Sequence, residues 1–154
     1  MLIVFDIDGT LANCDHRLHH IKEKPKNWKA FFEEAKNDTP IPAMVELFRT
    51  LYSGWATDGV TRHTILAVTG RPESTRYDTG KWLADNHCDV NKLYMRKNKD
   101  YRPDYVVKEE ILDQIITEYG QKPDMVFEDR KQVIDMWRQR GVFVVDVNQT
   151  GEDF

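Results

Sequence analysis

The sequence predicts a doubly wound α/β fold, in which a Rossmann-like parallel sheet of five strands is covered by helices on both faces. Two observations predict this fold. First, the chain contains five short apolar runs rich in β-branched residues, at 2–5, 64–69, 93–95, 125–128 and 143–147. Second, stretches with helical periodicity lie between most of these runs. Near-continuous apolar strands that alternate with amphipathic helices are typical of a parallel sheet buried on both faces.

The first run, LIVF at 2–5, is followed at once by Asp6 and Asp8. Like charges held close together repel one another. Two acids at the end of a strand therefore need compensation from elsewhere in the fold, by a cation or by basic side chains.

Residues 13–43 are polar, basic in places and too long for a simple strand-to-helix connection. They surround an aromatic group of Trp28, Phe31 and Phe32. We expect an inserted helical cap over the strand ends. Residues 53–63 carry two glycines and little periodicity, which predicts an exposed loop. That loop is long enough to alter access to a site.

Apolar residues recur at three- and four-residue steps in three further segments, which we expect to be helices. They are Met44, Leu47, Phe48 and Leu51 in the first, Val107, Ile111 and Ile115 in the second, and Val133, Met136 and Trp137 in the third. Met136 and Trp137 are expected to pack into the core.

The composition excludes several classes of protein. With 40% hydrophobic and 31% charged residues, the 154 residues are expected to form one soluble domain. No apolar run approaches the roughly 20 residues that span a bilayer, and Asp6 interrupts any signal peptide. Cys14 and Cys88 show no disulfide framework, so we expect a cytoplasmic protein with no membrane partner. The net charge of −4 means that nucleic-acid contact would need a local basic patch.

Polar side chains follow the strands at the edge where ligands bind in open α/β sheets. They are Asp6, Asp8 and Thr10 after the first strand, Thr69, Gly70 and Arg71 after the second, and Glu128, Asp129 and Arg130 after the fourth, with Lys108 near the start of the preceding helix. Four carboxylates meeting at one edge predict a hard cation, and Mg²⁺ fits best because it prefers oxygen ligands and leaves room for phosphate and water.

The same residues suit phosphoryl transfer. A carboxylate can attack phosphorus and form an aspartyl-phosphate, which splits one difficult displacement into two easier ones. Because the transferred group is anionic, the attack needs a metal, a lysine and oriented donors. A second carboxyl group can protonate the leaving oxygen and later activate water.

These residues also resemble a known family. FDIDGTLA, TGR, a lysine before a helix, and EDR are similar to the four motifs of the haloacid dehalogenase (HAD) superfamily of phosphatases. RPDYVVKEEIL, EDRKQVIDMWRQRGV and the ending GEDF resemble the phosphatase half of phage polynucleotide kinase/phosphatase and its stand-alone relatives. The resemblance covers nearly the whole chain. It implies a HAD-type fold with residues 1–154 as one phosphatase domain, in the host cytoplasm if a phage encodes it.

The resemblance also implies roles for single residues. Asp6 would be the nucleophile and Asp8 the general acid/base. Mg²⁺ would be bound by Asp6, the backbone carbonyl of Asp8, and Asp129, while Thr69 and Lys108 would hold the phosphoryl group. Arg17, Arg71 and Asp104 fall where the subfamily has functionally important residues. The relatives usually carry two aspartates where this chain has Glu128 and Asp129, so a direct or a water-mediated metal contact of Glu128 stays open.

Further substrate contacts are expected from Thr10, Gly70, Arg96, Arg102 and Asp104. LYMRKNKDYR at 93–102 interleaves two tyrosines with basic residues, a combination suited to phosphates and stacked bases, although a solvated charged loop is the commoner explanation. Lys108, likewise, could be a solvated helix residue, and Asp104 after Pro103 could be a helix N-cap instead. Arg130 is expected to make structural hydrogen bonds.

Cys14, His16, His19 and His20 match no strong zinc spacing. If one of these histidines faces the cleft, we expect it to help bind substrate and not to bind zinc.

The site residues therefore predict a Mg²⁺-dependent phosphomonoesterase. The resemblance implies that its substrate is a nucleic-acid or nucleotide phosphate, most specifically a 3′-phosphate terminus. The alternative on the same scaffold is a nucleoside monophosphatase or another small-metabolite phosphatase. A binding protein that keeps the fold without turnover is the alternative from a different class. No G-x-x-x-x-G-K-[ST] sequence is present, so no kinase activity is expected. Oligomeric state and the choice between DNA and RNA stay open.

Overall fold

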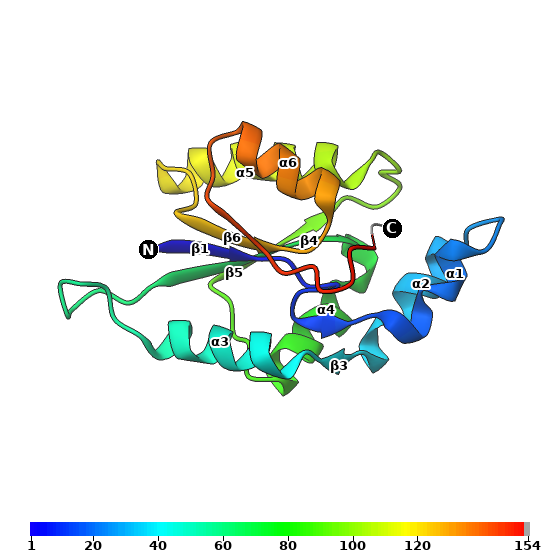
Figure 1. The fold of residues 1–154 in the computed structure, drawn as a ribbon, viewed down its shortest axis with the longest axis horizontal. Coiled ribbons are helices and arrows are strands. Elements are labelled where there is room, and N and C mark those ends of the chain that lie inside the picture. The colour runs from blue at the N-terminus through cyan, green and yellow to red at the C-terminus, as the bar shows by residue number, and fades with distance from the viewer. Residues whose placement is uncertain (153–154) are drawn as a thin grey trace.

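A five-stranded sheet forms the centre of the molecule (Figure 1). The computed structural model describes residues 1–152, so the last two residues of the GEDF ending lie outside the described residues. The strands are β1 (Leu2–Phe5), β4 (Thr64–Pro72), β5 (Lys92–Arg96), β6 (Met125–Glu128) and β7 (Val144–Asp146). Their order is β5-β4-β1-β6-β7, and every pairing is parallel. The expected doubly wound fold is confirmed.

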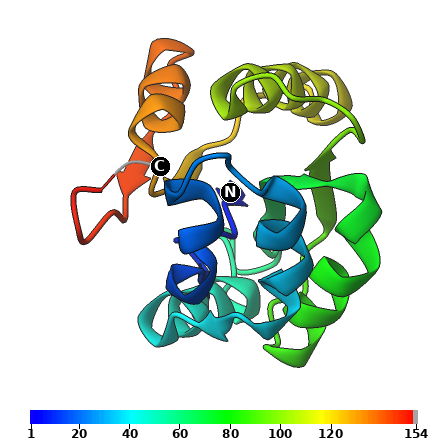
Figure 2. The same ribbon diagram turned by 90° about the vertical axis from the view of Figure 1, so that its right-hand side faces the viewer.

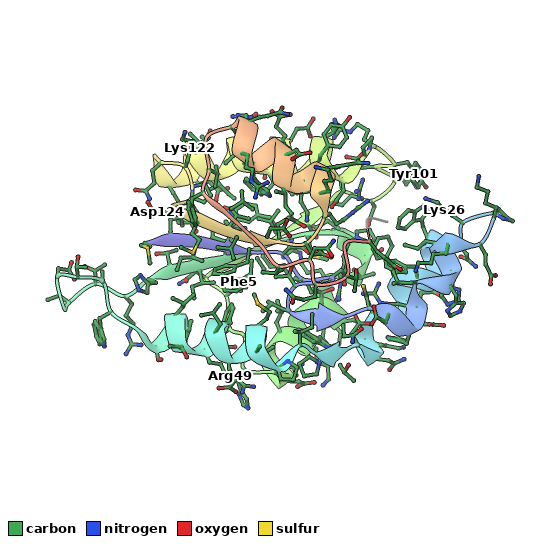
Figure 3. All side chains as sticks on the ribbon, viewed as in Figure 1. Phe5, Lys26, Arg49, Tyr101, Lys122 and Asp124 are labelled. Carbon is green, nitrogen blue, oxygen red and sulfur yellow. The ribbon has the colours of Figure 1, made fainter. Side chains whose placement is uncertain are left out.

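The central strand β1 is buried on both faces, which explains its continuous apolar run. Leu2 and Val4 point into one hydrophobic core, and Ile3 and Phe5 point into the other. Phe5, labelled in Figure 3, stacks on Phe127 with 4.4 Å between the ring centroids. Because β1 lies between β4 and β6, its carboxyl end is placed at the middle of the sheet edge.

Two helices cover each face of the sheet (Figure 1). One pair is α5 (Asp104–Tyr119) and α6 (Lys131–Gln139), and the other is α3 (Pro42–Ser53) and α4 (Arg76–Asp85). The three expected helices are confirmed, with α4 as an addition. No helix in the described part of the chain is long and apolar enough to cross a membrane.

The segment 13–43 folds into short elements beyond the carboxyl ends of the strands (Figures 1 and 2). These are β2 (Ala12–Asn13), η1 (Asp15–Arg17), α1 (His19–Lys22), α2 (Trp28–Glu33), η2 (Glu34–Asn37) and β3 (Thr39–Pro40), where β2 and β3 pair antiparallel. A third hydrophobic cluster of Cys14, Leu18, Ile21 and Phe31 holds the segment together. We call residues 13–43 the cap segment.

The loop at 54–63 lies at the opposite edge of the sheet from the cap segment (Figure 1). It joins the end of α3 to the start of β4, and a loop that leads into a parallel strand lies at the amino ends of the strands. The terminal ammonium group of Met1 contacts His63 Nδ1 at 3.0 Å there. The expectation that this loop alters access to the site is therefore wrong.

Candidate active site

A buried lysine compensates the charge of Asp6 at the end of β1. Lys108 extends from α5 and is 1% exposed. Its Nζ donates to Asp6 Oδ1 and to Glu128 Oε2, each at 2.8 Å, and lies 3.3 Å from Asp104 Oδ2. Burial lowers the pKa of Lys108, but the surrounding carboxylates outweigh it and raise the pKa well above its usual value. The interpretation of Lys108 as a solvated helix residue is therefore wrong.

Asp6, Glu128 and Asp129 form an acidic group in which one oxygen from each lies within 4.8 Å of the others. Burial raises the pKa of Asp6 well above its usual value, and the charge of Glu128 raises it further. Burial and Glu128 likewise raise the pKa of Asp129 to about 8. Ionising both Asp6 and Asp129 therefore requires more positive charge than Lys108 alone supplies.

Asp129 carries a buried oxygen, Oδ1, that has no hydrogen-bond partner within residues 1–152. Its carboxylate lies against Gly9, where an added Cβ would come 2.0 Å from Asp129 Oδ2. The glycine of the DIDGT motif thus leaves room for this carboxylate, and its φ of +83° also suits glycine. An orphaned carboxylate oxygen beside two other acids fits a divalent cation with oxygen ligands.

Both oxygens of Glu128 are already engaged. Oε2 accepts from Lys108, and Oε1 lies 3.3 Å from the backbone N–H groups of Asp129 and Arg130. The Asp8 side chain contacts two arginines, which is compatible with the expectation that its backbone carbonyl, and not its carboxylate, faces the metal.

Those arginines hold Asp8 firmly. Arg71 donates from Nη2 to Asp8 Oδ1 at 2.6 Å and from Nε at 3.1 Å, and Arg17 Nη2 donates to the same oxygen. Burial raises the pKa of Asp8, but the two guanidinium groups outweigh it and hold the pKa well below its usual range. In this arrangement Asp8 is ionised.

Asp38, in the cap segment, is a member of the site that the sequence did not indicate. Its fully buried carboxylate accepts from Arg17 Nε at 2.8 Å and from Arg71 Nη2 at 3.1 Å. Its backbone carbonyl accepts from Trp82 Nε1 at 2.7 Å, and His16 Nε2 lies 2.8 Å from Oδ1. Asp38 belongs to no recognised motif and does not follow a strand of the main sheet. The sequence around it therefore gave no indication that it lies in the site.

The residues after β4 lie beside this cluster. Thr69 is fully buried, and its Oγ1 accepts from the Arg71 backbone N–H at 3.2 Å. An added Cβ at Gly70 would come 2.3 Å from Asp104 Oδ1, so only glycine fits there. Thr10 is also fully buried, and its Oγ1 has no hydrogen-bond partner within the described residues.

Asp104 does not cap α5. Pro103 is the N-cap residue and no side chain caps this helix. The Asp104 carboxylate instead points toward the strand ends, 3.1 Å from Arg96 Nη2 and 3.5 Å from Arg130 Nη1. The N-cap interpretation is therefore wrong, because three basic side chains draw this carboxylate to the site.

The other candidates are held elsewhere. Arg102 is exposed and pairs with Asp100 and Glu110, at 2.7 and 2.6 Å, so the structure does not bring it into the cluster. Arg96 donates to the carbonyl of Gly70 at 2.9 Å and thus contacts the site only through backbone and Asp104. The thiol and imidazoles of the cap segment form no metal-binding group within residues 1–152.

Comparison with known proteins adds a family match. The family described as the polynucleotide kinase PNKP phosphatase domain matches residues 1–154. This match covers the whole chain, including every residue of the site described above.

Solved structures with a similar fold include a chain of the Pnkp1/Rnl/Hen1 RNA repair complex, with a TM-score of 0.72 and 23% identity over 94% of this chain and 41% of that one. A second structure of the Pnkp1/Rnl/Hen1 complex gives the same score and identity, with 45% of that chain covered. A haloacid dehalogenase-like family hydrolase from Streptococcus pneumoniae has a TM-score of 0.67 and 15% sequence identity. The match covers 94% of this chain and 83% of that one. This chain thus spans less than half of each Pnkp1-complex chain, and at these identities the likeness shows the fold.

Proposed function

Because this chain belongs to the polynucleotide kinase PNKP phosphatase domain family and is a HAD-type phosphatase, we propose that it removes the terminal 3′ phosphate from nucleic-acid ends. The reaction would depend on Mg²⁺ and pass through an aspartyl-phosphate on Asp6. One observation carries the mechanism: a buried lysine and a buried acidic group meet at Asp6, at the carboxyl end of the central strand.

Asp6 is the proposed nucleophile. Its carboxylate would attack phosphorus, a P–O bond to Asp6 would form, and the bond to the leaving oxygen would break. Lys108 holds Asp6 Oδ1 at 2.8 Å, which fixes the carboxylate and supplies positive charge next to the transferred group. Thr69 is proposed to donate its hydroxyl hydrogen to a phosphoryl oxygen.

Asp6 and Asp129, with the backbone carbonyl of Asp8, would hold Mg²⁺, and the unpartnered Oδ1 of Asp129 supports this assignment. The bound ion would neutralise charge that builds up on the phosphoryl oxygens. Glu128 would act differently, since Lys108 and two backbone amides engage its oxygens. We propose that Glu128 helps to fix the Lys108 ammonium group beside Asp6.

Asp8 is proposed to protonate the leaving oxygen and then to take a proton from the attacking water. In the substrate-free arrangement, Arg17 and Arg71 keep Asp8 ionised. A phosphate bound to these arginines would share their charge, which weakens their hold on Asp8 and raises its proton affinity. Arg17 and Arg71 are therefore proposed to bind substrate and to set the protonation state of Asp8.

The substrate class rests on family membership. The Pnkp1 complex that shares this fold is an RNA repair complex, which supports a nucleic-acid end as substrate. We propose that residues 1–154 act as one domain, that the cap segment covers the bound end, and that the protein works in the cytoplasm. A nucleoside monophosphatase on the same site is the second candidate, because the cap segment could also enclose a single nucleotide.

Phosphate release tests this proposal. The parent protein is assayed with Mg²⁺ on a 3′-phosphorylated oligonucleotide, on 3′- and 5′-mononucleotides and on p-nitrophenyl phosphate, beside Asp6→Asn. Asp113→Asn is the matched control, since Asp113 is exposed on α5 and pairs with Arg140 at 2.6 Å. We expect the highest kcat/KM on the oligonucleotide, none for Asp6→Asn and the parent value for Asp113→Asn. A preference for mononucleotides would favour the second candidate, and activity in Asp6→Asn would refute the nucleophile.

A further inference from the structure

The loop that follows β5 runs along the same edge of the sheet as the site. It starts at Arg96, the last residue of β5. Arg96 donates from Nε to the carbonyl of Gly70 at 2.9 Å, one residue after Thr69. Figure 3 shows Tyr101, in this loop, and Lys26, in the cap segment, at the same end of the molecule.

Every second residue of this loop anchors it to the body of the protein. Arg96 donates to the carbonyls of Asp100 and Arg102 at 3.1 and 2.7 Å. The Asn98 side chain accepts from the Ser74 backbone N–H at 2.8 Å. The Asp100 carboxylate binds Arg102, which in turn pairs with Glu110. The loop is thus fixed to β4, to the turn that precedes α4 and to α5.

The alternate residues Lys97, Lys99 and Tyr101 are exposed, and we call them the 97–101 ridge. Tyr101 is 88% exposed, the highest value among the large apolar side chains of the described chain. Within residues 1–152 none of the three side chains makes a hydrogen bond or an ion pair. An ordered loop therefore presents one exposed aromatic ring and two exposed ammonium groups beside the proposed phosphate site, and the charge of Lys97 also acts on Glu110.

We infer that the 97–101 ridge binds the single-stranded nucleotides next to the terminal phosphate, an inference that rests on the proposed function. The Tyr101 ring stacks on a base, which it can do for any sequence because every base has a π face. Lys97 and Lys99 pair with backbone phosphates. The chain as a whole has a net charge of −4, so attraction to a nucleic-acid strand has to come from local basic groups, and this ridge supplies two of them.

The anchoring explains why such a contact is effective. A ring held on a fixed loop loses little conformational entropy when a base stacks on it. Stacking and ion pairing to the strand do not involve the transferred phosphate, so the ridge acts on strand binding and leaves the chemical step unchanged.

The test compares Tyr101→Ala with the parent protein on a 3′-phosphorylated oligonucleotide and on p-nitrophenyl phosphate. For the oligonucleotide, KM is expected to rise roughly tenfold, the effect of removing one base–aromatic stack, with kcat unchanged. For p-nitrophenyl phosphate both constants should stay at the parent values. Tyr101→Trp should restore the oligonucleotide KM. Phe143→Ala is the control, because Phe143 is 65% exposed. It directly precedes β7, the outermost strand on the side of the sheet opposite β5.

The double variant Lys97→Gln/Lys99→Gln tests whether the positive charges of the ridge contribute to strand binding. Binding of a labelled 3′-phosphorylated oligonucleotide is measured by anisotropy at several salt concentrations, with Asp6→Asn in the background to prevent turnover. The slope of log K against log salt should fall by roughly 0.7 for each phosphate that a lysine no longer neutralises.

Three outcomes are decisive. If Tyr101→Ala raises KM for the oligonucleotide alone and the lysine variant lowers the salt slope, the inference is supported. If the parent prefers the oligonucleotide and both variants match it, the inference is wrong while the proposed function stands. If the parent releases phosphate from p-nitrophenyl phosphate but not from the oligonucleotide, the proposed function fails and the inference fails with it.

Discussion

The arginines of the site are held by two aspartates from different parts of the fold. Asp8 follows the central strand, and Asp38 lies in the cap segment between η2 and β3. Arg17 and Arg71 each contact both carboxylates, so two positive and two negative charges are buried together. Such a buried cluster is stable only while every charge keeps its partners. Asp38 is therefore a positioning residue for both arginines.

Asp38→Asn should lower kcat/KM roughly 100-fold on every substrate, because displaced arginines no longer meet the phosphoryl group correctly. The loss of the Asp38 charge also leaves Asp8 as the main anionic partner of both arginines and lowers the pKa of Asp8 further. Since Asp8 is the proposed general acid and must be protonated to act, the alkaline limb of the kcat profile should move to lower pH. Steady-state assays across pH measure both effects.

A purely structural role would lower the amount of folded protein and leave the pH profile in place. Circular dichroism at the assay temperature separates these cases, with Asp85→Asn as a matched control on the exposed end of α4, where Asp85 pairs with Lys81. An unshifted profile in folded Asp38→Asn would contradict the assignment.

The sequence predicted those residues of the site that follow strands. Asp6, Asp8 and Asp129 could be placed because each lies just beyond an apolar run, where parallel strands gather ligands. Asp38 could not, since its partners are distant in sequence and only the folded cap segment brings it to them. For Asp104 the sequence left a substrate contact and a helix cap as alternatives, because local sequence does not show the basic side chains that draw its carboxylate inward.

At the scale of elements, the cap segment has its own small core. The cluster around Phe31 is separate from the two cores that flank the sheet. Phe31 also touches the site, because the Arg17 guanidinium lies over its ring, 4.1 Å from the centroid, and donates to its carbonyl at 3.2 Å. A small independent core opens more easily than a large one. Cap packing and the position of Arg17 are thus coupled.

Phe31→Ala should loosen the cap segment while the sheet stays intact, since truncation of a buried phenylalanine destabilises its surroundings by about 3–5 kcal/mol. Hydrogen exchange measured by mass spectrometry should speed up in peptides from residues 13–43 and stay unchanged in those covering β1 and β4. Activity should fall because Arg17 loses its support. Phe143→Ala is the matched control for an exposed ring. Equal acceleration throughout the chain would show that the cap segment is not a separate unit.

The sequence predicted strands better than the connections between them. All five strands appear as short apolar runs, although only β1 is buried along its whole length and the edge strand β7 is half-buried to exposed. Helix α4 was missed because its buried side chains are only Thr79, Trp82 and Leu83, too few to give a clear period. The 53–63 loop was recognised, but its position at the amino ends of the strands depends on the topology of the whole sheet.

At the scale of the molecule, the fold concentrates acidic side chains at one point of the sheet edge. Lys108 is the one lysine that contacts the acidic group of Asp6, Glu128 and Asp129 among the described residues. Burial of these acids opposes folding unless they are protonated or bound to a cation. The stability of the whole protein should therefore respond to pH and to divalent ions through this group.

Without metal, the protein should become less stable as the pH rises from about 4 to about 8. Unfolded, Asp129 ionises near its ordinary value of 3.8, whereas in the fold its pKa is about 8. Between these values the folded protein holds a proton that the unfolded chain has lost, and the resulting loss of stability is complete above the higher value. The proposed Mg²⁺ would bind the ionised carboxylates, so it should raise Tm more at alkaline pH than at mildly acidic pH. Asp129→Asn should flatten the pH dependence and abolish the Mg²⁺ response, whereas Asp113→Asn should keep both. The Tm of each protein is measured across pH with Mg²⁺ or with a chelator. If Mg²⁺ raises Tm equally in the two variants, Asp129 does not bind the ion.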